Sequence, residues 1–264
     1  MAQYRIDSDQ YLDHNKTTFE VVMIGDQDGN IVNTFGAASN VIISAGNLAG
    51  YTGVHKFGAV FDTNGSGFNT IWTYAPTVAL YSWSTSAGQV TVVSDNGSDT
   101  GQITVQGLDT SYNFVEETFT LTGATPTSAS AATFLRVNRA FMVDDTNVGE
   151  ILVKNGTTVV TQIEPGMGQT LQAFYTVPAG KTAYLLNLNV SASKNQVVDT
   201  FLFQRPFGGA FRVSATVSLN QGNQSIEYPV PIKFTEKTDI DLRVRGSANA
   251  TISSDYTLIL VDNA

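Results

Sequence analysis

The sequence predicts an all-β protein, built from two antiparallel β-sandwich or jelly-roll-like modules with little helix. Three observations support this class. Short runs rich in Val, Ile, Thr and aromatic residues recur every ~8–12 residues, with turn signals between them. The run Asp239–Arg245 alternates apolar and charged residues, which is typical of an antiparallel strand with one solvated face. No stretch of a dozen residues has a helical period.

The composition favours a surface built from short polar side chains. Of the 264 residues, 42% are hydrophobic and only 14% are charged, against roughly 25% charged in an average soluble domain. Short hydroxyl and amide side chains lose less entropy than long charged ones when contacts immobilise them, so this surface suits repeated subunit contacts. The net charge is −9, and the few Lys and Arg are scattered. A nucleic-acid partner is therefore not expected, because it would require a basic stripe.

Few residues are available for catalysis or for cofactor binding. The chain has no cysteine and two histidines, His14 and His55, which are isolated in sequence. We therefore expect no disulfide, no metal site, no cofactor and no enzymatic activity. The start of the chain lacks the pattern of a signal peptide, and no apolar run approaches the ~20 residues of a membrane span. These features predict a protein that is made in a host cytoplasm and has no membrane partner.

The N-terminal region predicts an arm and a hairpin. Residues 1–16 are polar and are expected to order only against a partner. Phe19–Ile24 and Ile31–Phe35 flank an Asp-Gly turn at residues 26–30, which predicts a β-hairpin. The apolar run Val41–Ile43 predicts a short strand.

An aromatic-rich segment between Phe68 and Trp83 has two interpretations. Each large aromatic side chain buries about 150–250 Å², which favours a place in a core or an interface. Exposed rings at this density would instead stack on sugars. We keep four residues as candidate contacts to a glycan or another partner: Trp72, Tyr74, Tyr81 and Trp83.

The middle of the chain reads as a series of strands separated by turns. A Ser, Thr and Ala stretch at residues 125–133 predicts a loop. The predicted strands are Val90–Val93, Gln102–Val105, Phe114–Leu121 and Phe134–Val143. Residues 1–144 hold 5 basic and 13 acidic residues, whereas residues 145–264 hold 9 and 10. We therefore predict one module at 17–144 and a second at 145–264, with a single continuous sandwich as the alternative.

The second half predicts a hairpin and an edge strand. Tyr175–Val190 contains a strand, a turn at Pro178–Lys181, and a second strand whose Leu186, Leu188 and Val190 share a face. Its Gly-Lys-Thr is not a nucleotide-binding loop, because no glycine lies five residues earlier and a strand follows in place of a helix. Tyr228–Phe234 predicts an edge strand, since its two prolines cannot donate to a ladder.

One pair of carboxylates has a spacing compatible with acid–base chemistry. Asp239 and Asp241 lie two residues apart in a predicted strand, so they share a face at about 6.5–7 Å, close to an inverting glycosidase geometry. Arg243 and Arg245 continue the same face. With these arginines, the pattern predicts an exposed row of charges that screen one another, and we prefer this interpretation to a catalytic pair.

Seven short motifs together resemble a family of virion structural proteins from tailed phages, particularly phages of marine cyanobacteria and similar hosts. The motifs are Val54–Gly58, Thr70–Trp72, Gly107–Asp109 with Tyr112–Asn113, Arg136–Arg139, Gly168–Thr170, Tyr175–Thr182 and Glu236–Ile240. The resemblance implies a non-enzymatic capsid decoration or neck protein that binds other virion proteins and forms a homo-oligomer such as a trimer. A tail, baseplate or fibre adhesin for host surface glycans is the alternative.

Overall fold

The computed structural model describes residues 24–25, 31–32, 36–63, 67–246 and 250–263. The chain divides into two units, residues 1–53 and 54–264, which we describe separately. The predicted arm at residues 1–16 lies outside the described residues. In the first unit, β1 (Ile24–Gly25) pairs antiparallel with β2 (Ile31–Val32), which confirms the predicted hairpin for its described residues.

A nine-residue helix, α1 (Gly36–Ser44), occupies the position of the strand predicted at Val41–Ile43, so this prediction was wrong. Gly46 ends the helix in the left-handed conformation, with φ of 71°. Its N–H donates to the carbonyl of Ile43, and the N–H of Asn47 donates to the carbonyl of Ile42, each at 3.0 Å. Glycine satisfies this C-terminal motif without steric cost. Three apolar residues were too few to distinguish a strand from a helix.

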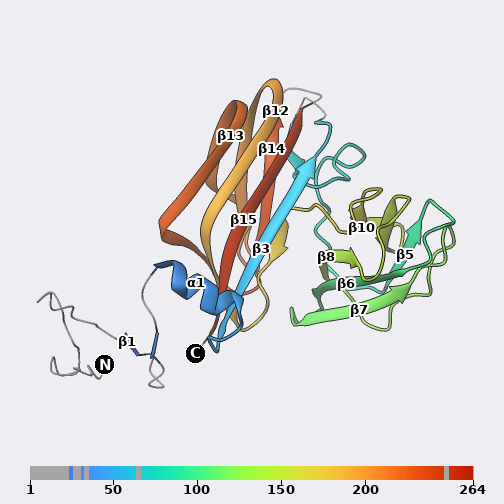
Figure 1. The fold of residues 1–264 in the computed structure, drawn as a ribbon, viewed down its shortest axis with the longest axis horizontal. Helices are drawn as coiled ribbons and strands as arrows, with labels where there is room; N and C mark the ends of the chain where they lie inside the picture. Colours follow the sequence, from blue (N-terminus) through green and yellow to red (C-terminus); the bar gives the residue numbers. More distant parts are fainter. Residues whose placement is uncertain (1–23, 26–30, 33–35, 64–66, 247–249, 264) are drawn as a thin grey trace, which may run out of the picture. The chain divides into compact units, whose positions relative to one another are not determined.

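The all-β class is confirmed, because the second unit consists of antiparallel strands (Figure 1). The larger of its parts is one sheet in the order β11-β14-β12-β15-β3, with β13 beside β12 and β4 beside β14. Its strands are β3 (Tyr51–Val60), β4 (Asn69–Thr70), β11 (Phe174–Thr176), β12 (Lys181–Arg205), β13 (Arg212–Phe234), β14 (Asp239–Gly246) and β15 (Thr251–Asp262).

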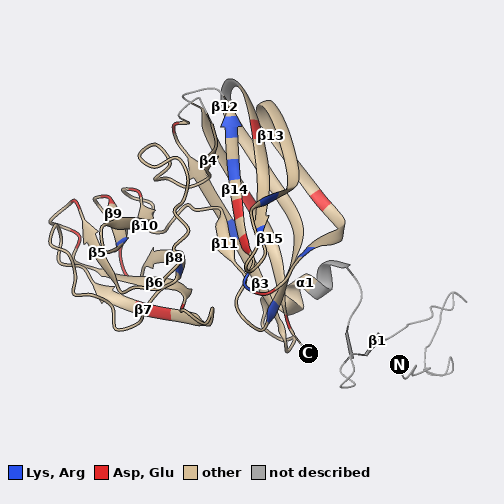
Figure 2. Ribbon diagram, turned by 180° about the vertical axis from the view of Figure 1, so that it is seen from behind, with Lys and Arg blue, Asp and Glu red and all other residues tan. Residues whose placement is uncertain are grey.

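The long strand β12 belongs to both layers of a folded sheet. Its first half pairs with β15, and Ala192 lies opposite Ile252. Its second half pairs with β14, and Val198 lies opposite Gly246. The strand β13 follows both halves of β12. The ribbon turns over between the two halves, so that β15 lies towards the viewer in Figure 1 and β14 in the reverse view of Figure 2. We call this folded sheet the jelly roll.

Gly246 lies where the ribbon bends. A Cβ atom at this position would lie 2.6 Å from the carbonyl oxygen of Val197, closer than real Cβ contacts come. Only glycine allows the backbones of β12 and β14 to approach this closely. The bend brings apolar residues of the two layers together in one core. Its largest fully buried side chains include Trp72, Phe174, Phe234 and Tyr256.

A smaller sandwich is inserted in the chain between β4 and β11. Two three-stranded antiparallel sheets, in the orders β10-β9-β5 and β7-β6-β8, enclose a second core. The strands are β5 (Val90–Ser94), β6 (Gln102–Leu108), β7 (Phe114–Thr120), β8 (Arg136–Met142), β9 (Ile151–Asn155) and β10 (Thr158–Ile163). We call this part the small sandwich.

The sheets do not divide between residues 144 and 145, so the predicted modules 17–144 and 145–264 need correction. β5 pairs with β9 across this position, with Val92 opposite Val153. β3 and β4 pair within the jelly roll, although they precede the small sandwich in the chain. Asp144 and Asp145 lie in an exposed loop of the small sandwich. The change in charge density therefore marks a solvated loop and not a linker between modules.

The predicted hairpin at Tyr175–Val190 is also corrected. β11 pairs with β14, with Tyr175 opposite Ile240, and β14 separates β11 from β12. The turn between β11 and β12 therefore crosses over a strand from the end of the chain. A register shift lies between Leu185 and Asn187 of β12. This bulge makes Leu185 fully buried and leaves Leu186 partly exposed, so Leu186 does not share the buried face of Leu188.

Candidate functional site

Two of the four candidate aromatic residues are buried in the jelly-roll core. Trp72 is 2% exposed and Tyr81 is 6% exposed, whereas Tyr74 and Trp83 are half-buried. Tyr81 stacks on Phe174 with ring centroids 4.0 Å apart, and Trp72 meets Tyr81 edge to face at 5.4 Å. A sugar-binding platform needs an open ring face, and neither Trp72 nor Tyr81 offers one. These contacts support the interpretation of Trp72 and Tyr81 as core residues.

Trp83 lies close to two arginine side chains. The guanidinium carbon of Arg136 lies 5.2 Å from the indole ring centroid, and that of Arg205 lies 5.5 Å from it. The indole N–H donates to Oδ2 of Asp241 at 3.3 Å. Cations over an indole ring gain attraction from its electron-rich face. Trp83 therefore already contacts two protein cations where a glycan would have to stack.

Asp239 lies at the centre of this arrangement and accepts hydrogen bonds from two arginines. Nε of Arg136 lies 3.0 Å from Oδ1 and its Nη2 lies 3.2 Å from Oδ2, which is a bidentate pair. Nε and Nη2 of Arg205 lie 2.9 and 2.5 Å from Oδ2. The hydroxyl of Thr176 donates to Oδ1 at 2.6 Å. The side chains of Arg136 and Asp239 are each 4% exposed, so this is a buried ion pair.

The row of charges on β14 differs from the exposed row that we predicted. Figure 2 shows its acidic and basic positions following one another along the strand. Asp239 and Asp241 are buried, and only Arg245, whose side chain is 52% exposed, reaches well into solvent. Burial raises the pKa of Asp241, although Nε of Arg243 donates to its Oδ2 at 2.7 Å. Each aspartate is thus hydrogen-bonded to an arginine.

Aromatic rings extend this row across the rear layer of the jelly roll. Arg243 lies over the rings of Phe203 and Phe211, 4.5 and 4.6 Å from their centroids. Arg245 lies over Phe68 and Phe201, 5.5 and 5.3 Å away. We call the whole set the arginine–aromatic ladder: Arg136, Arg205, Arg243 and Arg245 with Trp83, Phe211, Phe203, Phe201 and Phe68. It covers apolar rings with cations that are already paired with carboxylates.

Arg136 comes from β8 and Asp239 from β14, so their pair connects the small sandwich with the jelly roll. Nη1 of Arg136 also donates to the carbonyl of Ser84 at 2.6 Å. Additional hydrogen bonds join the two parts: Nε2 of Gln172 donates to the carbonyl of Val137 at 3.0 Å. We call these contacts, together with those of Lys56 described next, the joint.

Lys56 of β3 adds a buried cation to the joint. Its Nζ donates to the carbonyl of Asn138 on β8 at 2.6 Å. Burial, with a smaller contribution from the positive charge of Arg139, lowers the pKa of Lys56 to about 7. A lysine is expensive to bury because its ammonium group loses hydration. The joint therefore contains a charge whose protonation changes near neutral pH.

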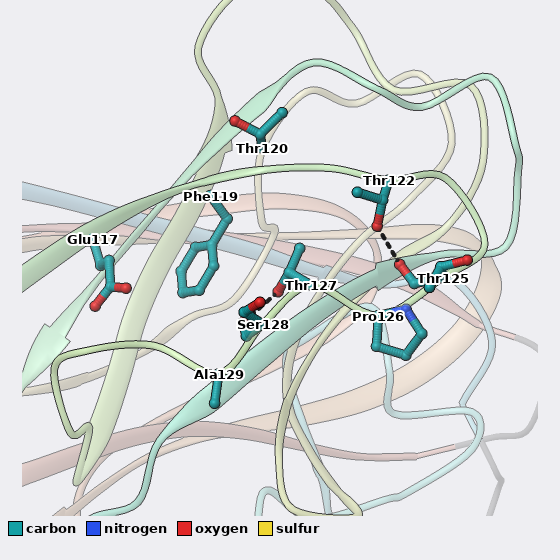
Figure 3. A pocket seen from close by; sticks show the side chains of 9 residues that line it. All are labelled: Glu117, Phe119, Thr120, Thr122, Thr125, Pro126, Thr127, Ser128 and Ala129. Carbon is teal, nitrogen blue, oxygen red and sulfur yellow. Dashed lines mark hydrogen bonds between the residues drawn. The ribbon is translucent and has the colours of Figure 1, made fainter.

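A shallow groove of about 500 Å³ lies on the small sandwich (Figure 3). Its lining consists of Glu117, Phe119, Thr120, Thr122, Thr125, Pro126, Thr127, Ser128 and Ala129. The carboxylate of Glu117 accepts from the N–H groups of Ala131 and Ala132, each at 2.9 Å. The hydroxyls of Thr122 and Thr127 donate to backbone carbonyls within the adjacent loop. These polar groups hold the loop in place and include no nucleophile paired with a base.

The described residues contain no cluster of three or more His, Asp or Glu side chains suited to a metal ion. Nor do they include a helix that is long and apolar enough to cross a membrane. His55 lies with its Nε2 3.3 Å from Oδ1 of Asp255, whereas His14 is outside the described residues.

Sequence reasoning missed the residues at the centre of the site. Arg136 was assigned to a strand and to a short motif, and Asp239 was weighed as one of a carboxylate pair and then assigned to an exposed row of charges. One signal was present: Arg136 stands between Leu135 and Val137 in an apolar run, and an arginine in such a run must find a partner when buried. Its partner lies 103 residues away in sequence, beyond any local pattern.

Comparison with known proteins assigns no family to this chain. No protein-family model and no curated protein matches it. Among solved structures, the VP2 subviral particle of infectious bursal disease virus is similar over 81% of this chain and 73% of that chain, with 9% identity and a TM-score of 0.24. A structure of the Gt strain of this virus gives 11% identity and a TM-score of 0.20, over 82% and 78% of the two chains. Similarities at this level carry no argument about function.

Proposed function

We propose that this chain is a non-enzymatic structural protein of a virus particle, in line with the tailed-phage resemblance of its motifs. It would decorate or cement the capsid or associate with the neck, in many copies. The observation that carries the proposal is the joint, in which Asp239 is shared by Arg136 of the small sandwich and Arg205 of the jelly roll. This arrangement fixes two β-sandwiches as one building block and leaves none of these charges free for a substrate.

A fixed building block is what a repeated contact requires. If the two sandwiches moved freely, each contact with a neighbour would have to restrict that motion at an entropic cost. Buried, hydrogen-bonded ion pairs contribute orientation more than stability, because desolvation offsets most of their attraction. With many copies on one particle, weak individual contacts suffice for stable attachment. The partners would be other virion proteins and further copies of this chain.

The proposal is tested by locating the protein on purified particles. Antibodies against the full-length chain would be used for immunogold labelling of intact particles, and quantitative mass spectrometry would give the number of copies. We expect regular labelling at one position on the particle. Recovery of the protein only in the particle-free fraction of the lysate would contradict the proposal.

The role of the joint is tested separately by incorporation of variants. Arg136→Ala removes the buried contact between the sandwiches, whereas Arg245→Ala removes an arginine of the same ladder whose side chain is half exposed and lies 3.4 Å from Asp199. We expect Arg136→Ala to reduce the copies per particle and Arg245→Ala to leave them unchanged. Equal incorporation of both variants, each shown to be folded, would contradict a role of the joint in incorporation into particles.

A further inference from the structure

One strand of the jelly roll has a long free edge. β13 extends from Arg212 to Phe234, and β12 is its single partner among the described residues. Such an edge presents unpaired N–H and C=O groups that can add another strand. By contrast, β14 lies between β11 and β12, and β15 lies between β12 and β3, so these two strands are paired on both sides. β13 therefore needs either protection or a partner.

The second part of β13, Asn223–Phe234, carries the usual protection of an edge. Pro229 and Pro231 have no N–H to offer, and Glu227 and Lys233 place charges along the strand. An additional strand would have to lose two hydrogen bonds and bury these charges. One edge strand of the small sandwich is protected in a similar way, because β7 carries Glu116 and Glu117 and pairs only with β6 among the described strands.

The first part of β13, Val213–Asn220, has none of this protection. It contains neither a proline nor a charged residue. Val217 and Leu219 point into the core, while Thr216, Ser218 and Asn220 are exposed. Val213 at its start is 48% exposed. One strand thus protects one half of its edge and leaves the other half open, which indicates that the open half is covered in the assembled protein.

A second copy of the same chain is the occupant that the charges favour. Residues 213–220 carry no charge, so a charged partner would find no complementary group on this segment. Two copies can meet at this uncharged edge without like-charge repulsion. Two such edges are also self-complementary, because antiparallel pairing about a twofold axis matches N–H groups with C=O groups. Thr and Ser side chains opposite one another would add cross-strand contacts.

We propose that Val213–Asn220 of β13 pairs edge to edge, antiparallel, with the same segment of a second copy. The pairing joins the rear layers of two jelly rolls into one continuous sheet and covers the exposed side chain of Val213. This deepens the proposed function, because it names the contact between neighbouring copies. The pairing itself requires no particle, so it can be tested on the isolated full-length chain.

The test measures the mass of the protein in solution by light scattering across a concentration series. The wild type is expected to approach twice its chain mass of 28.3 kDa. The double variant Thr216→Lys/Asn220→Lys places two charges on the open half and is expected to remain a monomer. The matched control, Asn223→Lys/Ser225→Lys, adds the same charge at exposed positions of the protected half and should dimerise like the wild type. Circular dichroism melting confirms that each variant is folded.

Amide hydrogen exchange of the wild type provides a readout that needs no variant. Exchange within Val213–Asn220 should slow as the concentration rises through the dimerisation range, while Asn223–Phe234 should not change. A monomeric or trimeric wild type would overturn the proposal, and so would a variant Thr216→Lys/Asn220→Lys that still dimerises. Loss of the dimer in the control variant to the same extent would also overturn it. Absence of the wild-type protein from particles would instead contradict the proposed function and leave the dimer result intact.

Discussion

The jelly roll and the small sandwich are built from similar strands but differ in how far apart their partners lie in the chain. In the small sandwich, β6 and β7 pair as neighbours, and so do β9 and β10. In the jelly roll, β12 pairs with β14 and β15, which lie near the end of the chain. β14 also pairs with β4, which precedes the small sandwich in the chain. Local turns thus set these two pairs of the small sandwich, and β5 joins them by pairing with β9 from farther along the chain, whereas the jelly roll closes only when its two ends meet across the whole insertion.

Because of this difference, substitutions of single residues should reduce the stability of the protein to different extents. A residue that joins the two parts should affect the whole unit when it is changed. A residue within the small sandwich should affect chiefly that part, and a surface residue should affect neither. The following predictions are ordered by expected size and test whether the two parts are coupled as described.

Asp239→Ala should cause the largest loss of stability. The substitution leaves the buried guanidinium of Arg136 without its carboxylate, and removing one partner of a buried pair costs about 3–5 kcal/mol. Urea unfolding followed by tryptophan fluorescence would measure this loss. A loss below about 1 kcal/mol, typical of exposed pairs, would show that the joint does not couple the two parts.

Lys56 should make stability rise with pH above neutrality. Burial lowers its pKa in the folded chain to about 7 from an ordinary value of 10.5. Between these values the unfolded chain binds more protons, so the free energy of unfolding increases as the pH is raised, by as much as about 2–3 kcal/mol between pH 7 and 9. Lys56→Met should flatten this dependence.

The pH series for Lys56 should stop below pH 10. Burial raises the pKa values of Tyr81, Tyr175 and Tyr256 above the ordinary tyrosine value. Above pH 10 these tyrosines ionise more readily in the unfolded chain, which lowers stability for an unrelated reason. An identical pH dependence in wild type and Lys56→Met at pH 7–9 would contradict the assignment.

Asp99 should stabilise the small sandwich in a way that is lost in acid. Burial alone would raise its pKa, but hydrogen bonds from the Ser94 hydroxyl and the N–H groups of Val148 and Gly149 hold the pKa below its ordinary value. This stability is present above the pKa of the unfolded carboxyl and disappears as the pH falls through the folded pKa.

We expect Asp99→Asn to cost about 1–3 kcal/mol at pH 7, as is usual when buried donors lose their acceptor. The difference from the wild type should shrink as the pH is lowered towards 3. Thermal melts over this range would measure it. A difference that stays constant with pH would show that the carboxylate charge is not involved.

Arg245→Ala should have the smallest effect. The Arg245 side chain is half exposed and its Nη2 lies 3.4 Å from Oδ2 of Asp199, so solvent screens the pair and we expect a loss of about 0.2–1 kcal/mol. Urea unfolding would measure it beside Asp239→Ala. Equal losses from the two variants would remove the distinction between the buried and the exposed ends of the arginine–aromatic ladder.

The parts that could be predicted from sequence are those with local signals. The strands predicted at Val90–Val93 and Gln102–Val105 correspond to β5 and β6. The turn between β6 and β7 follows from Asp109, whose Oδ1 accepts from the N–H groups of Ser111 and Asn113. The edge position of β13 was indicated by its prolines and is confirmed by its pairing with β12.

The parts that could not be predicted depend on contacts between distant segments. Nothing near Tyr175 indicates that β14 separates β11 from β12. Likewise, the alternation of Asp239–Arg245 predicts one solvated face, but the small sandwich and its Arg136 lie against the beginning of that face. Arg136 from another part of the fold compensates the buried charge of Asp239, whereas Asp241 is paired with Arg243 on the same strand.

The central claim is that the joint holds the small sandwich and the jelly roll in one fixed orientation. Because the chain has no cysteine, two can be introduced for spin labels without background, at the exposed residues Thr120 of the small sandwich and Ser253 of the jelly roll. Pulsed electron paramagnetic resonance, with excess unlabelled protein, would measure the distance distribution within one chain. We predict one narrow distribution that broadens in Arg136→Ala, and a broad distribution in the otherwise unchanged protein would contradict the claim.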